Sequence, residues 1–373
     1  MQTAIINCRV FSEEQILEDS VILVEGGLIK SLEKEIPPGA EVIDLGGSNI
    51  APGLIDIQIN GGESLYFSDV PTAETLHDIC DSSLKYGVTY VLPCLISSPR
   101  EKILAAIESV QQFMQQFPGK GVIGMHLEGP FINPGKRGAH SLSAIRKPNT
   151  AELEEIVRHA KGVIRVMTIA PELFTDEQLD LLQSNDIILS AGHSMMGYEQ
   201  ARYYFERGIK LVTHLYNAMT QMGHREPGMV GAIFDNDDVY APIILDGAHC
   251  HYAAARIASR VKKEKLFLIS DAAFLGRKVK SFQSDLLDAR LDGEFYRNTE
   301  GNLAGAAISM QEAVQNAVQF VGLPLQAAIR MATINVAHAI GMDKHIGKIE
   351  AGYPARFVTF NDDFSACKTI IPR

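Results

Sequence analysis

Residues 211–219 read Leu-Val-Thr-His-Leu-Tyr-Asn-Ala-Met, an apolar start that meets a histidine and continues into a polar turn. This pattern is typical of a buried strand that ends at the mouth of a barrel, where barrel enzymes keep their active sites. A single histidine at a strand end is more often a structural residue with a satisfied hydrogen bond. Whether His214 binds a metal ion therefore depends on what ends the other strands.

Apolar runs of strand length alternate with amphipathic helical patterns through most of the chain. The expected strands are residues 54–59, 88–95, 122–127, 164–169, 187–191, 211–214, 240–245 and 266–270, and the expected helices between them include 72–86, 100–117, 151–160, 176–183, 198–207 and 252–261. Apolar strands that alternate with helices indicate parallel strands covered by helices. Eight such units favour a closed (β/α)8 barrel of the TIM type over a doubly wound sheet.

The two ends of the chain carry a different pattern, with short strands separated by turns. Strand-like segments occur within residues 1–48 and again at 355–360 and 368–371. We expect them to pair into one small β-sandwich domain, because neither end holds enough strands to fold alone. The predicted division is therefore residues 1–50 and 346–373 for this domain and 51–345 for the barrel.

The composition is that of an ordinary globular protein with an acidic surface. Of the 373 residues, 46% are hydrophobic and 21% are charged, and the net charge of −11 argues against a general nucleic-acid surface. The five cysteines are scattered without a C-x-x-C pair, which favours a reducing, cytoplasmic location and no thiolate zinc site. The sequence shows no export signal and no apolar run of membrane-spanning length, so we expect no membrane partner. It also lacks the G-x-G-x-x-G turn of dinucleotide-binding folds and a Walker motif, so we expect no cofactor bound through either motif.

Four of the expected strands end in side chains that suit metal chemistry. Glu128 follows residues 122–127, His193 follows 187–191, His214 ends its own strand and Asp271 follows 266–270. Two imidazoles and a carboxylate form the ligand set of an open catalytic zinc site, in which the fourth position is left for water. Asp271 would then be free to act as a base.

His126 lies two residues before Glu128 and points to the same face of that strand. We interpret it as a barrel-interior residue that hydrogen bonds near the ligands and does not bind the metal itself. The pair also spells H-x-E, as in nucleobase deaminases, but Pro93-Cys94 lacks the P-C-x-x-C partner that those enzymes need.

Several ordered motifs carry a family resemblance that runs along nearly the whole chain. They are His-Leu-Glu-Gly-Pro-Phe at 126–131, Ser-Ala-Gly-His-Ser at 190–194, Thr-His-Leu-Tyr-Asn-Ala-Met at 213–219, Arg-Glu-Pro-Gly at 225–228, Asp-Gly-Ala-His at 246–249 and Leu-Ala-Gly at 303–305. With these motifs the chain resembles the N-acetylglucosamine-6-phosphate deacetylases of the amidohydrolase superfamily. The resemblance implies a metal-bearing barrel with a small β-domain, in agreement with the reading of the strand pattern.

The resemblance also implies roles for individual residues. It points to Glu128, His193 and His214 as the metal ligands and to Asp271 as the catalytic acid and base. The substrate contacts that it implies are Ala139, His140, Asn217, Ala218, Arg225, Asp246, Gly247, Ala248, His249, Leu303, Ala304 and Gly305. Among these, His140 is expected to donate toward the carbonyl oxygen or a sugar hydroxyl, and Arg225 and His249 are the candidates for the phosphate. By the same analogy, Arg225 reaches a neighbouring subunit's pocket in a homodimer or higher homo-oligomer.

The first barrel strand departs from the pattern of many amidohydrolases. Those enzymes carry His-x-His there to hold a second metal ion, whereas this chain has Gln58-Ile-Asn60. Amides are poor zinc ligands beside imidazole. We therefore predict one divalent ion per subunit, with Zn²⁺ favoured and Fe²⁺, Co²⁺ or Mn²⁺ as alternatives.

The expected reaction is hydrolysis of the acetamide of N-acetylglucosamine 6-phosphate to glucosamine 6-phosphate and acetate. The alternatives are another amidohydrolase activity, such as N-acetylgalactosamine-6-phosphate deacetylation or a dihydroorotase-like reaction, and a non-catalytic scaffold. Gln58 and Asn60 speak against the ring-opening branch, and the retained ligand set speaks against a scaffold. The poorly patterned residues 274–291, together with 298–302, are expected to form an irregular lid loop at the barrel rim.

Overall fold

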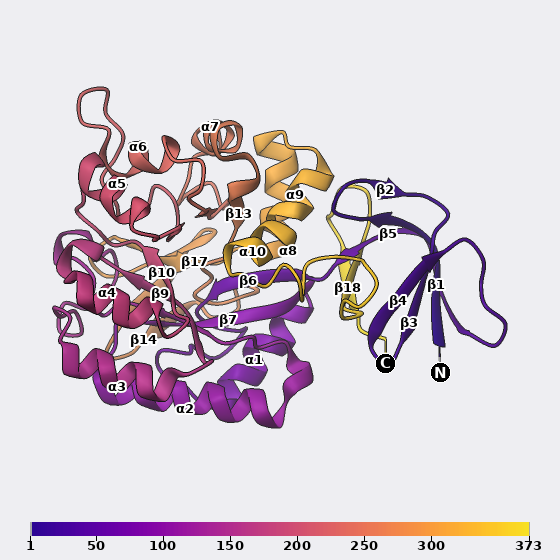
Figure 1. Ribbon diagram of the computed structural model, residues 1–373, viewed down its shortest axis with the longest axis horizontal. Coiled ribbons are helices and arrows are strands. Elements are labelled where there is room, and N and C mark those ends of the chain that lie inside the picture. Colours follow the sequence, from indigo (N-terminus) through magenta and orange to yellow (C-terminus); the bar gives the residue numbers. More distant parts are fainter. Residues whose placement is uncertain (1, 373) are drawn as a thin grey trace.

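The computed structural model describes residues 2–372 and shows a helix-covered barrel beside a smaller sheet that holds both ends of the chain (Figure 1). Six strands form one parallel sheet, in the order β11-β10-β9-β8-β7-β6. Their bounds are β6 (Leu54–Ile59), β7 (Val88–Ile96), β8 (Met125–Glu128), β9 (Ile164–Ile169), β10 (Ile188–Ala191) and β11 (Leu211–Val212).

Two further strands complete the ring. β12 (Ala241–Ile243) and β13 (Leu266–Leu268) pair in parallel with each other. Parallel bridges join Leu211 to Tyr240 on one side and Ile59 to Ala272 on the other, so the eight strands run round a closed barrel. All eight predicted strands are confirmed, with ends shifted by three residues or fewer.

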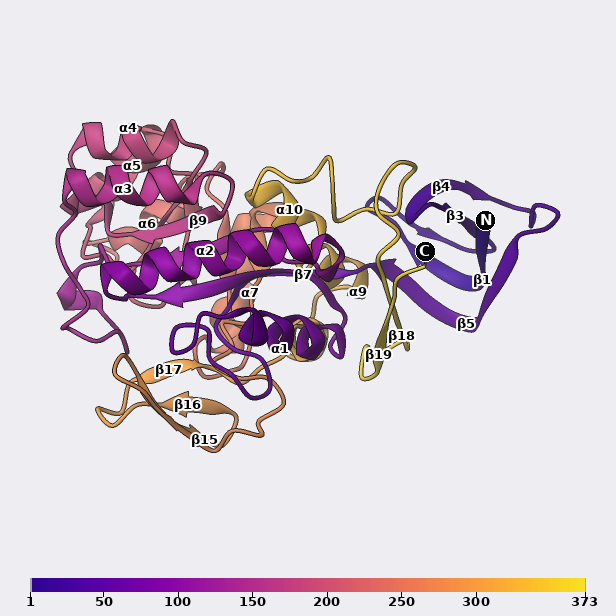
Figure 2. The same cartoon turned by 90° about the horizontal axis from the view of Figure 1, so that it is seen from below.

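The helices cover the outside of the barrel, as parallel strands require (Figures 1 and 2). They are α1 (Ala73–Leu84), α2 (Arg100–Gln116), α3 (Thr150–Ala160), α4 (Asp176–Gln183), α5 (Tyr198–Glu206), α6 (Gly228–Phe234), α7 (Tyr252–Lys262), α8 (Met310–Asn316), α9 (Leu325–Met331) and α10 (Ile334–Ala339). Short turns of 3-10 helix occur at Pro118–Lys120, Pro134–Lys136, Pro171–Leu173 and Lys263–Lys265, and Ala317–Val321 forms a π-helical turn. The six predicted helices are confirmed. None of the helices in the described residues is long and apolar enough to cross a membrane.

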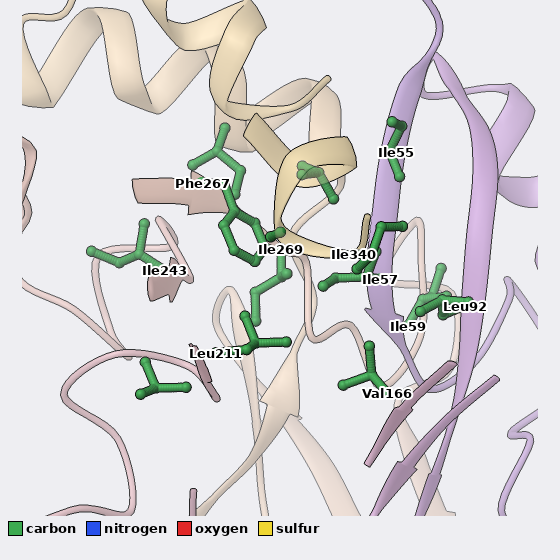
Figure 3. Packing of buried hydrophobic residues seen from close by; sticks show 14 of the residues in the cluster. Ile55, Ile57, Ile59, Leu92, Val166, Leu211, Ile243, Phe267, Ile269 and Ile340 are labelled. Carbon is green, nitrogen blue, oxygen red and sulfur yellow. The ribbon is translucent and has the colours of Figure 1, made fainter. Parts of the chain in front are cut away.

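The core lies in the barrel and between the barrel and its helices. Every residue of β6 is buried, because a central parallel strand is covered on both faces. Figure 3 shows Ile57, Val166 and Leu211, from three strands, near Ile269, which follows β13, and all four are buried in one large apolar cluster. This packing fixes the strand ends on which the polar side chains sit.

The two ends of the chain form one small sheet, as predicted. Its strands are β1 (Gln2–Phe11), β2 (Ile16–Leu17), β3 (Val21–Glu25), β4 (Leu28–Glu33), β5 (Glu41–Pro52), β18 (Phe357–Phe360) and β19 (Cys367–Ile370). β5 runs parallel to β1 and antiparallel to β18, which joins the C-terminal hairpin to the N-terminal strands. Hydrogen bonds link all seven strands into a single mixed sheet, where the sequence had suggested a sandwich.

Part of the expected irregular lid belongs instead to an antiparallel sheet, which we call the flap (residues 281–306; Figure 2). It contains β14 (Ser281–Gln283), β15 (Asp288–Asp292), β16 (Phe295–Arg297) and β17 (Leu303–Ala306). The prediction of an irregular loop was wrong for residues 281–283 and 288–291, where the strands are too short to give a clear pattern, whereas 274–280 and 298–302 lie outside the strands as expected. Phe282 and Tyr296 of the flap both pack against Phe274, which precedes the flap, in an apolar cluster separate from the barrel core.

Candidate metal centre and substrate cavity

A cavity of about 230 Å³ opens at the carboxyl ends of the barrel strands. Parallel barrels keep their chemistry at this end. The lining residues are Asn60, Tyr66, Ile96, Glu128, Gly138, Ala139, His140, His193, His214, Asn217, Ala218, His249, Asp271, Leu287, Asn302, Leu303, Ala304 and Gly305. The structure thus brings together most of the predicted site residues, from the barrel rim and the flap.

Glu128, His193 and His214 form a tight triangle of potential metal ligands. Oε1 of Glu128 lies 3.2 Å from Nε2 of His193 and 3.1 Å from Nε2 of His214, and the two Nε2 atoms are 3.1 Å apart. A tetrahedral zinc ion with bonds of ~2.0 Å places its ligand atoms ~3.3 Å apart. The spacing of the three atoms therefore fits one small divalent cation.

The protonation of His193 supports the same conclusion. Its Nδ1 lies 2.8 Å from the carbonyl oxygen of Lys136, which can only accept, so Nδ1 carries the proton. In the neutral ring, Nε2 then presents a lone pair to the carboxylate oxygen of Glu128. Two acceptors at this distance repel each other unless a cation lies between them, and an imidazole oriented by a carbonyl is typical of metal-ligating histidines.

The loops that follow the strands hold three of the site residues in unusual backbone conformations. His193, His214 and Asp271 have φ angles of 49°, 27° and 46°, in the left-handed region that non-glycine residues seldom occupy. Such residues gather at functional sites, where the surrounding structure compensates for the strain. The strand-to-loop turn thereby aims each side chain across the barrel mouth.

Two amides from β6 and the residue beyond it bind the carboxylates. Nε2 of Gln58 donates to Oε1 of Glu128 at 3.1 Å and to Oδ1 of Asp271 at 3.2 Å, and Nδ2 of Asn60 donates to the same Asp271 oxygen at 2.9 Å. The amides thus act as donors, in the place where a His-x-His pair would supply ligands. Burial and the negative charge of Glu128 raise the pKa of Asp271 to about 6.

His140 lies beside the triangle and presents a donor. The backbone N–H of Ser97 donates to Nδ1 of His140 at 3.3 Å, and the Ser97 hydroxyl is 2.8 Å from the same atom. Nδ1 therefore accepts, the proton sits on Nε2, and Nε2 lies 3.8 Å from Oε2 of Glu128. Ligand atoms of Glu128, His140 and His193 all lie within 4.8 Å of one another. A substrate bound at an ion on Glu128 and His193 would therefore lie within reach of His140. Burial and the nearby His193 lower the pKa of His140 to about 3.

His126 hydrogen bonds inside the barrel, below the triangle. Its Nδ1 donates to the carbonyl oxygen of Ile57 at 3.1 Å, and its Nε2 lies 2.7 Å from Oγ1 of Thr168. Burial lowers the pKa of His126 to about 4. Both ring nitrogens are occupied by these contacts, in agreement with the interpretation that His126 is not a ligand.

The loop after β12 places one predicted substrate contact at the cavity and three behind it. His249 lines the cavity, and its Nδ1 lies 2.6 Å from Oδ2 of Asp246. The other Asp246 oxygen accepts the backbone N–H groups of Ala248 and His249 at 2.9 and 2.8 Å. Asp246, Gly247 and Ala248 are absent from the cavity lining, and the contacts of Asp246 hold His249 in place.

Arg225 lies outside the cavity of its own chain. It is exposed in the segment between β11 and α6, next to the exposed Met222, and it is not among the lining residues. Any role for Arg225 in binding substrate therefore requires a second chain or a movement of this segment.

Sequence reasoning missed one wall of the cavity. Tyr66, Ile96 and Leu287 line it from the loop after β6, from the end of β7 and from the flap, and Gly138 and Asn302 add two further positions. Leu287 and Asn302 fall within the segments that the sequence placed at the barrel rim, but no pattern singled out either residue. Tyr66, Ile96 and Gly138 fit ordinary core or loop patterns, and the only signal was that Ile96 ends β7.

Comparison with protein families identifies both parts of the chain. The amidohydrolase family model matches residues 49–371, and the NagA composite domain model matches residues 3–50. Among curated proteins, the chain is 34% identical to N-acetylglucosamine-6-phosphate deacetylase of Haemophilus influenzae, over 100% of the chain and 98% of that protein. It is 36% identical to N-acetylgalactosamine-6-phosphate deacetylase of a Shewanella strain, over 95% of the chain and 91% of that protein.

Solved structures agree with the sequence comparison. The N-acetylglucosamine-6-phosphate deacetylase of Pasteurella multocida superposes with a TM-score of 0.94 at 32% identity, over 100% of this chain and 98% of that one. An aspartate-to-alanine mutant of the Mycobacterium smegmatis enzyme, in complex with N-acetyl-D-glucosamine-6-phosphate, superposes with a TM-score of 0.89 at 26% identity, over 98% and 96% of the two chains. The chain belongs to the N-acetylglucosamine-6-phosphate deacetylase family of amidohydrolases.

Proposed function

We propose that the chain hydrolyses the acetamide of N-acetylglucosamine 6-phosphate to glucosamine 6-phosphate and acetate. The observation that carries this proposal is the triangle of Glu128, His193 and His214 at one end of a cavity that Asp271 also lines. Amide hydrolysis needs an activated water, a stabilised oxyanion and a proton for the leaving nitrogen. The three ligands and Asp271 supply groups suited to these needs.

The three ligands would hold one divalent ion, with Zn²⁺ favoured by the two imidazoles and the carboxylate. Such an ion, when bound, lowers the pKa of a water molecule and polarises the substrate carbonyl. Gln58 and Asn60 act as donors to carboxylates, which supports a single ion per chain. Metal analysis of the purified protein distinguishes Zn²⁺ from Fe²⁺, Co²⁺ and Mn²⁺.

Asp271 is assigned the proton transfers. Its carboxylate takes a proton from the attacking water as the new C–O bond forms, and returns it to the nitrogen as the C–N bond breaks. Its pKa of about 6 suits a group that must both accept and release a proton near neutral pH. Asn60 and Gln58 bind only Oδ1 within the described residues, which leaves Oδ2 for the water.

His140 is assigned to the carbonyl oxygen. Because Ser97 fixes the proton on Nε2, the ring offers an N–H donor toward the cavity. A donor already in place stabilises the charge that develops on that oxygen in the transition state. Asn217, Ala218, His249 and residues 303–305 also line the cavity and are assigned to contacts with the sugar.

The first test compares substrates that differ at one hydroxyl. Purified protein is assayed for acetate release from N-acetylglucosamine 6-phosphate and from its galactosamine epimer, with metal content measured on the same sample. We expect a higher kcat/KM for the glucosamine substrate. The opposite order would favour the second candidate function, N-acetylgalactosamine-6-phosphate deacetylation, which the 36% identity to the Shewanella enzyme makes a specific alternative. Release from neither substrate would overturn the proposal.

We further propose that the protein is a homodimer in which Arg225 of one chain binds the phosphate in the partner's cavity. Arg225 is exposed and away from its own cavity, and a guanidinium matches phosphate oxygens in a bidentate manner. We expect Arg225→Ala to lower kcat/KM for the phosphorylated substrate by about 10- to 100-fold, the effect of losing charge-assisted hydrogen bonds. The same change should leave the weaker turnover of unphosphorylated N-acetylglucosamine unchanged.

A mixture of two impaired variants, assayed with the phosphorylated substrate, separates action between chains from action within one. Arg225→Ala and Asp271→Asn chains are unfolded together, refolded and assayed. A mixed dimer keeps one complete site if Arg225 acts across the interface, so random mixing should restore about a quarter of wild-type activity. No recovery, with mixed dimers shown to be present, would place Arg225 in its own chain's site or outside the mechanism.

A further inference from the structure

Beneath the ligand triangle, a chain of buried hydroxyl groups crosses the barrel interior. Nε2 of His126 lies 2.7 Å from Oγ1 of Thr168, which lies 2.7 Å from Oγ1 of Thr213, which lies 2.6 Å from Oγ of Ser190. All four residues are at most 2% exposed. We call these four residues the hydroxyl chain. The proposed reaction makes no use of them.

The direction of donation in the hydroxyl chain is fixed at one end. The carbonyl oxygen of Ile57 can only accept, so it takes the proton of Nδ1 of His126. In the neutral imidazole, Nε2 then accepts from the Thr168 hydroxyl. Thr168 in turn accepts from Thr213, and Thr213 accepts from Ser190, so each hydroxyl has one defined donor role. A buried chain with a single consistent direction holds its members more rigidly than isolated pairs do.

The hydroxyl chain joins the strands that present the metal ligands. His126 precedes Glu128 by two residues on β8, Ser190 is on β10 three residues before His193, and Thr213 is next to His214. Thr168, on β9, stands between them and is the backbone partner of both Glu128 and Ser190. Each ligand-bearing strand is thus tied to its neighbours just below its ligand.

A glycine allows this close packing. A Cβ atom added to Gly192 would lie 2.7 Å from Cβ of Thr213 and 3.0 Å from Cγ2 of Thr168. Any side chain at this position would push the two threonines away from the residue that leads into His193. The two threonines can therefore keep their positions only because residue 192 has no side chain.

We propose that the hydroxyl chain sets the spacing of the ligand triangle and so controls how tightly the metal ion is held. His126, Thr168, Thr213 and Ser190 are positioning residues that act through Glu128, His193 and His214. The inference rests on the assignment of these three residues as ligands in the proposed function. Partners of metal ligands contribute in this way, and losing one weakens metal binding by about 10- to 100-fold.

The test compares two substitutions at Thr168. The hydroxyl of this residue hydrogen bonds to His126 and Thr213 and to none of the three ligands. Thr168→Val keeps the shape and removes the hydroxyl, whereas Thr168→Ser keeps the hydroxyl. Zinc affinity is measured by competition with a chromogenic chelator, and the geometry of the site by the visible absorption of the cobalt-loaded protein. We expect about a 10-fold or greater rise in the Kd of Thr168→Val, an altered cobalt spectrum, and near wild-type values for Thr168→Ser.

Thr333→Val is the matched control for general destabilisation. Oγ1 of Thr333 donates to the carbonyl oxygen of Ile329 at 2.8 Å, and Thr333 is 2% exposed and does not line the cavity. It should lower the melting temperature of the metal-free protein as Thr168→Val does, without changing the zinc Kd. If Thr168→Val matches wild type in Kd and cobalt spectrum while only its stability falls, the hydroxyl chain is a structural feature and the inference fails.

Gly192→Ala gives a second route to the same conclusion. This substitution removes no hydroxyl group, but the added methyl group displaces Thr213, so zinc binding should also weaken. Unchanged zinc affinity in a folded variant counts against the inference. All these affinities are measured without substrate. If wild type binds zinc with the expected dependence on Thr168 but deacetylates neither sugar phosphate, the proposed function falls while the inference stands.

Discussion

Asp271→Asn should retain its metal ion and lose about 100- to 10,000-fold in kcat, the range that a positioned acid and base contributes. The asparagine keeps the shape of the side chain, and its amide oxygen can still accept from Gln58 and Asn60, which bind Oδ1 of Asp271 at 3.2 and 2.9 Å. It cannot take a proton from the attacking water. Steady-state kinetics and metal analysis on one sample measure the two expectations together.

Asp238→Asn serves as the control for this experiment. Asp238 is an exposed carboxylate that pairs with Lys210 outside the cavity, so its loss should leave kcat unchanged. A turnover of Asp271→Asn within a few-fold of wild type, with full metal content, would remove Asp271 from the mechanism. Loss of the metal together with the activity would instead point to a ligand role for Asp271.

The sequence predicted the barrel, and the strand ends at which the candidate ligands lie, for a physical reason. A parallel barrel buries both faces of its strands, so strands such as β7 and β13 appear as mainly apolar runs that can be recognised without knowledge of their partners. The active end of each strand is then marked by the first polar residue after the run. This rule locates Glu128, His193 and Asp271 before any coordinates are known.

The remaining parts of the site depend on contacts between distant segments, which strand patterns do not encode. The flap was missed because its strands are short and pair with one another and, through Ala306 of β17, with Ala272 after β13. Its apolar side chains pack against Tyr66 from the loop after β6. The donor role of His140 follows from its contacts with Ser97, 43 residues away. The distance of Arg225 from its own cavity is likewise a property of the folded chain alone.

Dialysis of the protein against a chelator should abolish deacetylation, and one equivalent of Zn²⁺ per chain should restore it. Removing the ion leaves the lone pair of His193 facing the carboxylate of Glu128 at 3.2 Å, so the triangle should also lose stability. We expect the melting temperature to rise on metal addition and to reach its limit at one equivalent, because an ion that binds only the folded chain stabilises it. A second equivalent should bring no further rise in activity.

The matched variant for this stoichiometry carries Gln58→His together with Asn60→His. These changes replace two amides, which donate to Glu128 and Asp271, by two imidazoles, which are strong zinc ligands. We expect the double variant to bind a second ion, whereas wild type binds one. Two tightly bound ions in the wild-type protein would contradict the single-ion site, because they would require ligands where the structure places amide donors. Full activity after complete metal removal would contradict the metal-dependent mechanism itself.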